Sequence, residues 1–294
     1  MFSSLYSRRF WQLLTLLLAI AACGSHSAHA YSVRKIQCAD FAIYEPTKYA
    51  GCDELSMPLL LYLHGAPWFI DPARYDTLLR EIASSGCVVV FPIYGERDVL
   101  SPDFFHFDLW YADAVDKAVA GLRFVECGGT YWSPPALNLS IAGHSLGGAF
   151  ALKMSMWSKL PAPRQIILHD AAGYNWLPAL APDDPDWIED LRWLPDRSSL
   201  TIVAAFESAS AALNQGDENA AGVWARAWHR SGTLASRRAY LAWGGHFDVY
   251  GDGDYDLYAD VTIAALNASR PLRFFVDPAP GQRLDWAMDH WFTP

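Results

Sequence analysis

The chain has 294 residues, of which 52% are hydrophobic and 18% are charged, and its formal net charge is −10. This apolar content excludes an intrinsically disordered chain and is enough for one large α/β domain or two smaller domains. Such an acidic chain lacks the clusters of Lys and Arg that bind phosphate backbones, so no nucleic-acid partner is expected.

The first 30 residues have the pattern of an export signal. Two arginines precede an apolar run at residues 10–22, which is shorter than the roughly 20 residues of a membrane-spanning helix. Residues 28–30 (AHA) fit cleavage before Tyr31, whereas residues 20–23 resemble a bacterial lipobox that would leave Cys23 lipidated. Both routes predict an exported bacterial protein that is periplasmic, secreted or held at the outer membrane through a lipid on Cys23.

Apolar runs and helical periodicities then alternate along the chain. This alternation predicts an α/β fold, with a mainly parallel sheet that is covered by helices on both faces. Residues 31–294 are expected to form a single domain and a monomer. We predict strands at residues 33–47 (one or two edge strands), 58–63, 87–92, 137–142, 165–169, 200–206 and 238–243, and helices at residues 73–85, 109–125, 146–158, 222–229 and 257–268.

One segment does not follow this alternation. Residues 174–197 contain four prolines and three tryptophans, among them Trp176. Regular helices and strands do not tolerate prolines at this density. We therefore predict a lid-like insertion over one end of the sheet.

Export would place the four cysteines outside the leader in an oxidising compartment. Four cysteines allow three pairings, of which we favour Cys38–Cys52 together with Cys87–Cys127. Their spacing contains no CxxC motif and is not that of a zinc site. No metal and no organic cofactor are expected.

The strongest motif is GHSLGG at residues 143–148, which follows one predicted strand and opens a predicted helix. This is the context of a G-x-S-x-G nucleophile elbow, in which glycines let the chain turn sharply and expose Ser145. The backbone N–H of Leu146 would then face a developing oxyanion. A second donor is expected from Ala66, because His64-Gly65-Ala66 ends the strand at residues 58–63.

The general base is expected to be a histidine after the last strand. His246 follows the strand at residues 238–243 through two glycines, and no other histidine fits this position as well. A neutral imidazole there could accept the proton of the Ser145 hydroxyl.

The acid that orients this histidine remains open between two strand ends. The usual position, after the strand at residues 200–206, falls near Ala209, which has no carboxylate. Asp170 ends the preceding strand and is favoured because a carboxylate at that tip can reach the same imidazole. The remaining candidates are Glu207, Asp217 and Glu218.

Five stretches resemble the α/β-hydrolase superfamily, and within it the chlorophyllases and the plasma platelet-activating-factor acetylhydrolases. They are LYLHG, SSGCVVVFP, GHSLGG, ILHDAAG and GGHFDVYGD. Both families take the acid from the earlier strand, so the resemblance favours Asp170. Chlorophyllases typically carry Arg where Leu146 stands and Pro where Ala171 stands. The resemblance therefore implies ester hydrolysis and not a pigment substrate.

These observations predict an exported serine hydrolase that cleaves carboxylic esters. Its substrate is expected to be a small-molecule or lipid-like ester, with an apolar group bound by Trp68, Phe69 and Trp176. Two alternatives remain open. One is a non-catalytic binding protein with the same fold, and the other is an amidase or peptidase that uses the same three side chains.

Overall fold

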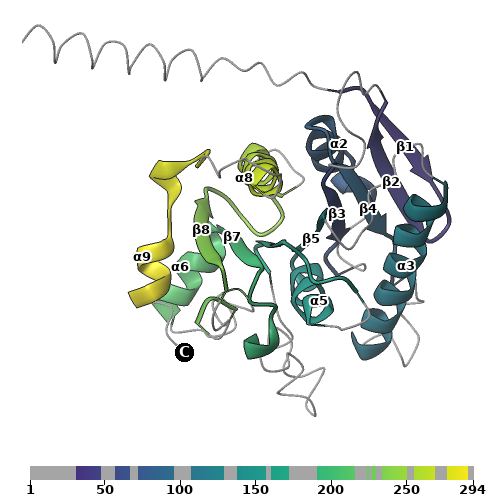
Figure 1. The fold of residues 1–294 in the computed structure, drawn as a ribbon. Coiled ribbons are helices and arrows are strands. Elements are labelled where there is room, and N and C mark those ends of the chain that lie inside the picture. The colour runs from purple at the N-terminus through teal and green to yellow at the C-terminus, as the bar shows by residue number, and fades with distance from the viewer. Residues whose placement is uncertain are drawn as a thin grey trace, which may run out of the picture.

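A computed structural model describes residues 31–47, 57–66, 72–95, 107–128, 138–156, 160–171, 191–215, 224, 227–229, 234–249, 255–268 and 277–290. These residues contain an eight-stranded sheet with the order β1-β2-β4-β3-β5-β6-β7-β8 (Figure 1). The β1–β2 and β2–β4 pairs are antiparallel, and every pair from β4 to β8 is parallel. The strands are β1 (Val33–Gln37), β2 (Phe41–Pro46), β3 (Leu59–Leu63), β4 (Val88–Pro92), β5 (Leu139–His144), β6 (Gln165–His169), β7 (Ser199–Ala205) and β8 (Ser236–Ala242).

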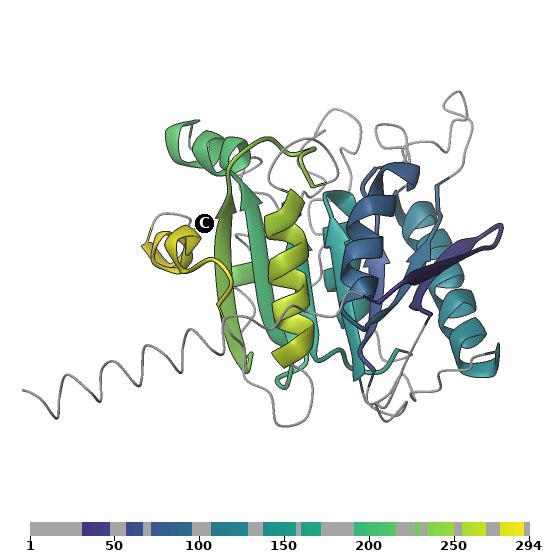
Figure 2. The ribbon, with the colours of Figure 1, turned by 90° about the horizontal axis from the view of Figure 1, so that it is seen from above.

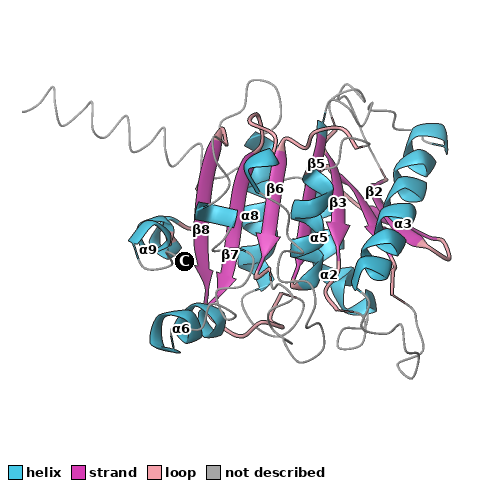
Figure 3. Cartoon of the chain, turned by 90° about the horizontal axis from the view of Figure 1, so that it is seen from below, coloured by secondary structure: helices cyan, strands magenta, loops and turns pink. Residues whose placement is uncertain are grey.

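The central strands are buried because helices cover both faces of the sheet. On one face lie α2 (Asp76–Ser84) and α8 (Tyr255–Ala268), which Figure 2 shows in front of the strands. On the other lie α3 (Phe107–Gly128) and α5 (Leu146–Ser155), seen in front in Figure 3. A strand such as β3 (LLLYL) is therefore apolar at every position but one, and all five of its residues are buried. This confirms the predicted mainly parallel sheet with helices on both faces.

Two segments differ from the predicted elements. Strand β2 lies inside the sheet, and only β1 of the predicted edge pair forms an edge. After β7 the chain enters α6 (Phe206–Gln215) directly, a helix that was not predicted. The predicted helix at residues 222–229 lies largely outside the described residues, and the other predicted strands and helices match the observed ones to within a few residues. None of the helices in the described ranges is both long and apolar enough to cross a bilayer.

A short C-terminal segment covers the outer edge of β8. It contains the 3₁₀ turn η6 (Pro280–Gln282) and α9 (Asp285–His290), neither of which was predicted. Arg283 forms an isolated antiparallel bridge with Tyr240, and the Leu284 N–H donates to the Ala239 carbonyl over 2.8 Å. The Ala239 N–H in turn donates to Asp285 Oδ1 over 2.6 Å. The backbone groups of β8 at this edge are thus partly paired.

The predicted disulfides are wrong for the cysteines that the structure describes. Cys38, Cys87 and Cys127 each carry a thiol. Cys87 is buried in the core between the sheet and the α2/α8 layer, whereas Cys127 is exposed near the end of α3 on the opposite face. The sheet therefore separates the two sulfur atoms of the predicted Cys87–Cys127 pair. Cys52, the predicted partner of Cys38, lies outside the described residues.

The predicted leader and most of the predicted insertion are also outside the described residues. They include the lipobox with Cys23 and all of residues 174–190. The described end of the insertion forms a 3₁₀ turn, η5 (Leu191–Trp193). Leu191 is buried there, and Trp193 is 75% exposed.

Candidate active site

Ser145 lies in the sharp turn between β5 and α5. Its φ and ψ are 54° and −126°, a backbone conformation that costs a non-glycine residue on the order of 1–3 kcal/mol. The surrounding backbone is so close that two positions accept only glycine. A Cβ on Gly143 would lie 2.2 Å from the Gly147 carbonyl oxygen, and a Cβ on Gly147 would lie 2.3 Å from the His64 carbonyl oxygen.

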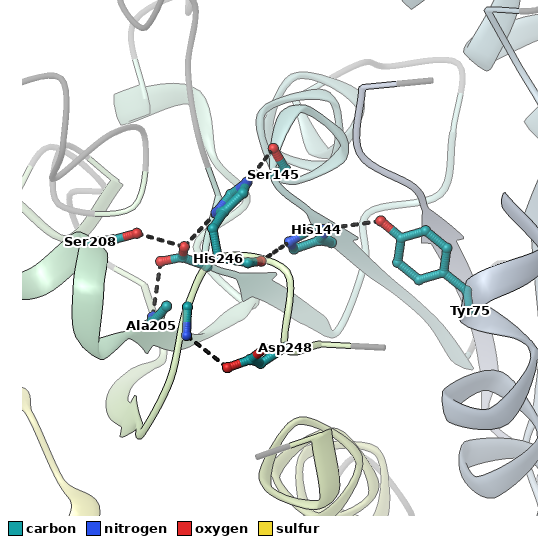
Figure 4. Close-up of polar contacts among 9 residues, drawn as sticks. Tyr75, His144, Ser145, Ala205, Ser208, His246 and Asp248 are labelled. Carbon is teal, nitrogen blue, oxygen red and sulfur yellow. Dashed lines mark hydrogen bonds and ion pairs between the residues drawn. The ribbon is translucent and has the colours of Figure 1, made fainter. Parts of the chain in front are cut away.

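His246 contacts Ser145 through one nitrogen of its ring (Figure 4) and Asp170 through the other. Its Nε2 is 2.8 Å from Ser145 Oγ, and its Nδ1 is 2.5 Å from Asp170 Oδ2. A carboxylate only accepts hydrogen bonds, so Nδ1 carries the proton and Nε2 accepts from the serine hydroxyl. In this arrangement the imidazole can remove the hydroxyl proton as the serine oxygen attacks an electrophile.

Asp170 is held by residues of the neighbouring strand β7 and of α6, the helix that follows β7. It is 1% exposed, and its φ of 41° turns the chain sharply at the end of β6. The Ala205 N–H donates to Oδ1 over 2.9 Å, and the Ser208 hydroxyl donates to Oδ2 over 2.7 Å. Its own N–H donates to the Val203 carbonyl over 2.7 Å. The end of β7 and the start of α6 therefore fix the carboxylate that faces the imidazole.

The other candidate acids do not take this position in the described structure. Glu207 is exposed in the first turn of α6, and its N–H donates to the Gly244 carbonyl over 3.2 Å. Asp217 and Glu218 lie outside the described residues. Ala209 is buried in α6, and Ser208, one residue earlier, reaches the acid instead. The sequence analysis missed Ser208 because a serine in this place has no local signature.

The loop that carries His246 is fixed on both sides of the imidazole. Asp248 Oδ2 accepts the Gly245 N–H over 2.7 Å, and the Asp248 N–H donates to the Gly245 carbonyl over 3.1 Å (Figure 4). The carbonyl of His246 itself accepts a hydrogen bond from His144 Nε2 over 2.7 Å. These contacts hold a base loop, which we define as residues 244–248.

Residues 64–66 form a second loop beside the elbow, which we call the oxyanion loop. His64 stacks on Tyr94 with ring centroids 3.9 Å apart, and its Nδ1–H donates to the Gly65 carbonyl over 2.7 Å. The Tyr94 N–H donates to His64 Nε2 over 3.2 Å, and the Tyr94 hydroxyl donates to the His64 carbonyl. The imidazole and the Tyr94 ring thus set the direction of the chain just before Ala66.

The two predicted oxyanion donors lie at the start of α5 and at the end of residues 64–66. Leu146 is the first residue of α5, so its N–H has no acceptor within the helix. Ala66 ends the described part of the oxyanion loop and belongs to the same buried cluster as Leu146. Gly147 carries the elbow against the backbone of Leu63 and His64, which brings the two loops into contact.

Three buried histidines stand at the ends of neighbouring parallel strands. Burial lowers the pKa of His64 to about 4 and that of His169 to about 3. Burial, and next the nearby His246, hold the pKa of His144 well below its ordinary value. All three are therefore neutral near pH 7 and act as directional hydrogen-bonding groups.

The predicted substrate-binding residues Trp68, Phe69 and Trp176 lie outside the described residues. Two other aromatic side chains are exposed just after β7 and β8. Phe206 and Trp243 are 42% and 60% exposed and stack with ring centroids 5.0 Å apart. Within the described ranges, no group of three or more His, Cys, Asp or Glu side chains is arranged to hold a metal ion.

Scans against models of known protein families and against curated proteins find no match. Among solved structures, the chain is similar to carboxyl esterase 2 from the mycorrhizal fungus Tuber melanosporum, with a TM-score of 0.51 and 18% sequence identity. The match covers 82% of this chain and 88% of that chain. At this identity the likeness concerns the fold. The chain therefore has the α/β-hydrolase fold, as its motifs predicted.

Proposed function

We propose that the protein is a serine hydrolase that cleaves carboxylic esters through an acyl-enzyme. The observation that carries this proposal is the hydrogen-bonded series Ser145–His246–Asp170, with the serine on a strained turn at the N-terminus of α5. The similarity to a carboxyl esterase and the motif resemblance to chlorophyllases and platelet-activating-factor acetylhydrolases support the same class of reaction.

The geometry implies a two-step mechanism. His246 Nε2 takes the Ser145 hydroxyl proton while Oγ attacks the acyl carbon, and the ester carbonyl oxygen becomes an oxyanion held by the Ala66 and Leu146 N–H groups. The imidazolium then gives its proton to the departing alkoxide, which leaves as the alcohol. Water repeats the sequence on the acyl-enzyme, releasing the acid and restoring Ser145. Asp170 stabilises the imidazolium in both steps.

Substrate and location complete the proposal. The predicted binding residues Trp68, Phe69 and Trp176 favour an ester with an apolar acyl or alcohol group, and the pattern of residues 1–30 favours an exported protein. Protein isolated from the cell envelope should begin at Tyr31 or at an acylated Cys23, which intact-mass measurement distinguishes. An unprocessed Met1 terminus would contradict export.

Replacing the nucleophile tests the reaction itself. Ser145→Ala should keep its fold and lower kcat for p-nitrophenyl esters by about 10⁴-fold or more. Ser155→Ala is a matched control, because Ser155 is a buried serine on the same helix whose hydroxyl donates to the Ala151 carbonyl. If Ser145→Ala kept more than a tenth of the wild-type rate, the assignment would be wrong.

A fluorophosphonate separates the enzyme from a non-catalytic protein with the same fold. It should label the wild-type protein on Ser145 and leave Ser145→Ala unlabelled, since only an activated serine reacts. Wild-type protein that stays unlabelled would favour a binding protein. Matched p-nitrophenyl esters and p-nitroanilides of increasing acyl length then show whether esters are preferred over amides.

A further inference from the structure

A second series of hydrogen bonds runs from the oxyanion loop to the base loop, and Figure 4 draws its part from Tyr75 through His144 to His246. The Gly65 N–H donates to the Tyr75 hydroxyl oxygen over 3.0 Å. The same hydroxyl is 2.7 Å from His144 Nδ1, and His144 Nε2 is 2.7 Å from the His246 carbonyl oxygen. Tyr75 and His144 are fully buried, so water does not compete for these bonds.

The His246 carbonyl oxygen, which is the last acceptor of the series, determines which atom donates in each of the other hydrogen bonds. The His246 carbonyl can only accept, so His144 Nε2 carries a proton. A neutral imidazole then has a lone pair on Nδ1, which accepts the Tyr75 O–H. The Tyr75 oxygen keeps lone pairs for the Gly65 N–H. The series is therefore polarised from Gly65 to His246, with Tyr75 selecting the His144 tautomer.

The neutral state of His144 matters for the reaction. Its ring centroid lies 4.8 Å from that of His246, which becomes an imidazolium when it takes the serine proton. A second positive charge at this distance would oppose that step. The O–H that Tyr75 aims at Nδ1 occupies the place where a second proton would bind.

A second buried tyrosine–histidine pair offers a comparison within the same sheet. Tyr62 donates to His169 Nδ1, and His169 Nε2 donates to Thr262 Oγ1, each over 2.9 Å. The Thr262 hydroxyl donates a hydrogen bond to the Tyr258 carbonyl over 2.7 Å. The chemistry is the same, but this series ends at the Tyr258 carbonyl in α8, whereas the first series ends at the His246 carbonyl in the base loop.

We propose that Tyr75 and His144 are positioning residues that tie the oxyanion loop to the base loop. The oxyanion donor must hold the reacting carbonyl, and the imidazole, on a different loop far apart in sequence, must hold the serine that attacks it, each to within about 0.5 Å. A series of hydrogen bonds that joins the two loops directly keeps their separation constant while charge moves between them. This inference rests on the proposed function, because it assigns roles relative to Ser145 and His246.

The test compares Tyr75→Phe with Tyr62→Phe. Each removes one buried hydroxyl that donates to a histidine, so similar falls in melting temperature are expected for both. Tyr75→Phe should lower the maximal rate of fluorophosphonate labelling, and kcat for p-nitrophenyl esters, by about 10²-fold, with KM changed by less than about threefold. Tyr62→Phe should keep both rates within about twofold of wild type.

Two further variants test whether the residues act together. His144→Gln keeps a donor and an acceptor at this place and should retain a higher kcat than His144→Leu, which keeps neither. Tyr75→Phe combined with His144→Leu should lose no more activity than the worse single variant, because one broken link already separates the loops. Fully additive losses would contradict a common series. All variants are compared at a temperature where circular dichroism shows them folded.

The outcomes also separate this inference from the proposed function. If the wild-type protein reacts with the fluorophosphonate and Tyr75→Phe reacts equally fast, the positioning role is overturned and the serine hydrolase stands. The same conclusion follows if Tyr62→Phe loses as much activity as Tyr75→Phe, since the loss then reflects general loosening of the core. If the wild-type protein neither reacts nor cleaves esters, the proposed function fails and the positioning role fails with it.

Discussion

The turns at the ends of the neighbouring strands β5 and β6 each hold a non-glycine residue in a strained backbone conformation, but they do so by different means. Both place a non-glycine residue at positive φ, 54° for Ser145 and 41° for Asp170, and both follow a buried neutral histidine. At the end of β5, glycines let the local backbone pack closely enough for the turn to form. At the end of β6, the residue before the aspartate is His169 and the one after is Ala171, and the turn is held by partners from β7 and α6.

The two turns differ in how far along the sequence the residues that determine them lie. The β5 turn is encoded within six consecutive residues, so a sequence motif finds it. The β6 turn is encoded by groups more than 30 residues away, because Ala205 and Ser208 lie 35 and 38 positions beyond Asp170. The functional assignment at β6 is accordingly the one that most needs mutational support.

After the loss of the Ser145 nucleophile itself, the largest effect on kcat is expected from the β6 turn. Asp170→Asn keeps the shape of the side chain but favours the wrong tautomer of His246, and a change of this kind in a comparable triad costs about 10⁴-fold. We expect kcat to fall by about 10³-fold or more, measured with p-nitrophenyl esters. Glu207→Gln, Asp217→Asn and Glu218→Gln are the controls and should stay within about tenfold of wild type. An essential role for one of these three, with Asp170→Asn active, would move the acid to the later strand.

The β5 turn should be destabilised by a side chain at Gly147, because the surrounding backbone leaves no room for a Cβ. A Cβ on Gly147 would lie 2.3 Å from both the Leu63 and the His64 carbonyl oxygens, which cannot move without shifting the oxyanion loop. Gly147→Ala should lower the free energy of unfolding by about 3 kcal/mol, measured by urea denaturation. Gly281→Ala, where a Cβ would meet nothing within 4 Å, should change it by less than about 0.5 kcal/mol. Equal free energies of unfolding for the two variants would show that the elbow accepts a Cβ at Gly147 without strain.

The buried histidines at the ends of β3 and β6 predict a loss of stability in acid. The folded protein keeps His64 neutral down to about pH 4 and His169 down to about pH 3, while the unfolded chain protonates both near 6.5. The unfolded state therefore binds more protons, and unfolding becomes easier as the pH falls from 6.5 towards 4. For each histidine that stays neutral in the folded protein, the free energy of unfolding falls by about 1.4 kcal/mol per pH unit as the pH is lowered through this window. Urea denaturation at pH 7 and pH 5 measures this, and imidazole ¹⁵N signals from His64 or His169 that titrate above pH 5.5 would contradict it.

The smallest effect should come from the missed contact at the β6 turn. Ser208→Ala removes one of the hydrogen bonds to the Asp170 carboxylate and leaves that from the Ala205 N–H. We expect kcat to fall about fivefold, as for the loss of about 1 kcal/mol of hydrogen bonding. Ser208→Thr keeps the hydroxyl and should restore most of the rate. An unchanged kcat in Ser208→Ala would show that Ala205 alone fixes the acid.

The sequence predicted the features that depend on nearby residues. Hydrophobic periodicity gave the strands and most helices, and the glycine pattern around Ser145 gave the elbow, because each signal lies within one element. Predictions that required two distant elements to meet were less secure. The Cys87–Cys127 pair was wrong because nothing in the sequence shows on which face of the sheet each side chain lies. The contact between Tyr75 and His144, 69 positions apart, was not foreseen for the same reason.

The segment along β8 has a consequence for how this sheet ends. A parallel sheet with an open outer strand offers a row of backbone donors and acceptors that a second chain can pair with. Here one bridge at Arg283 and two hydrogen bonds to Ala239 occupy part of that row, and the chain then turns into α9 instead of continuing as a strand. The C-terminal segment therefore pairs the middle of the β8 edge from within the same chain, which leaves a shorter row of backbone groups for strand addition by a second chain.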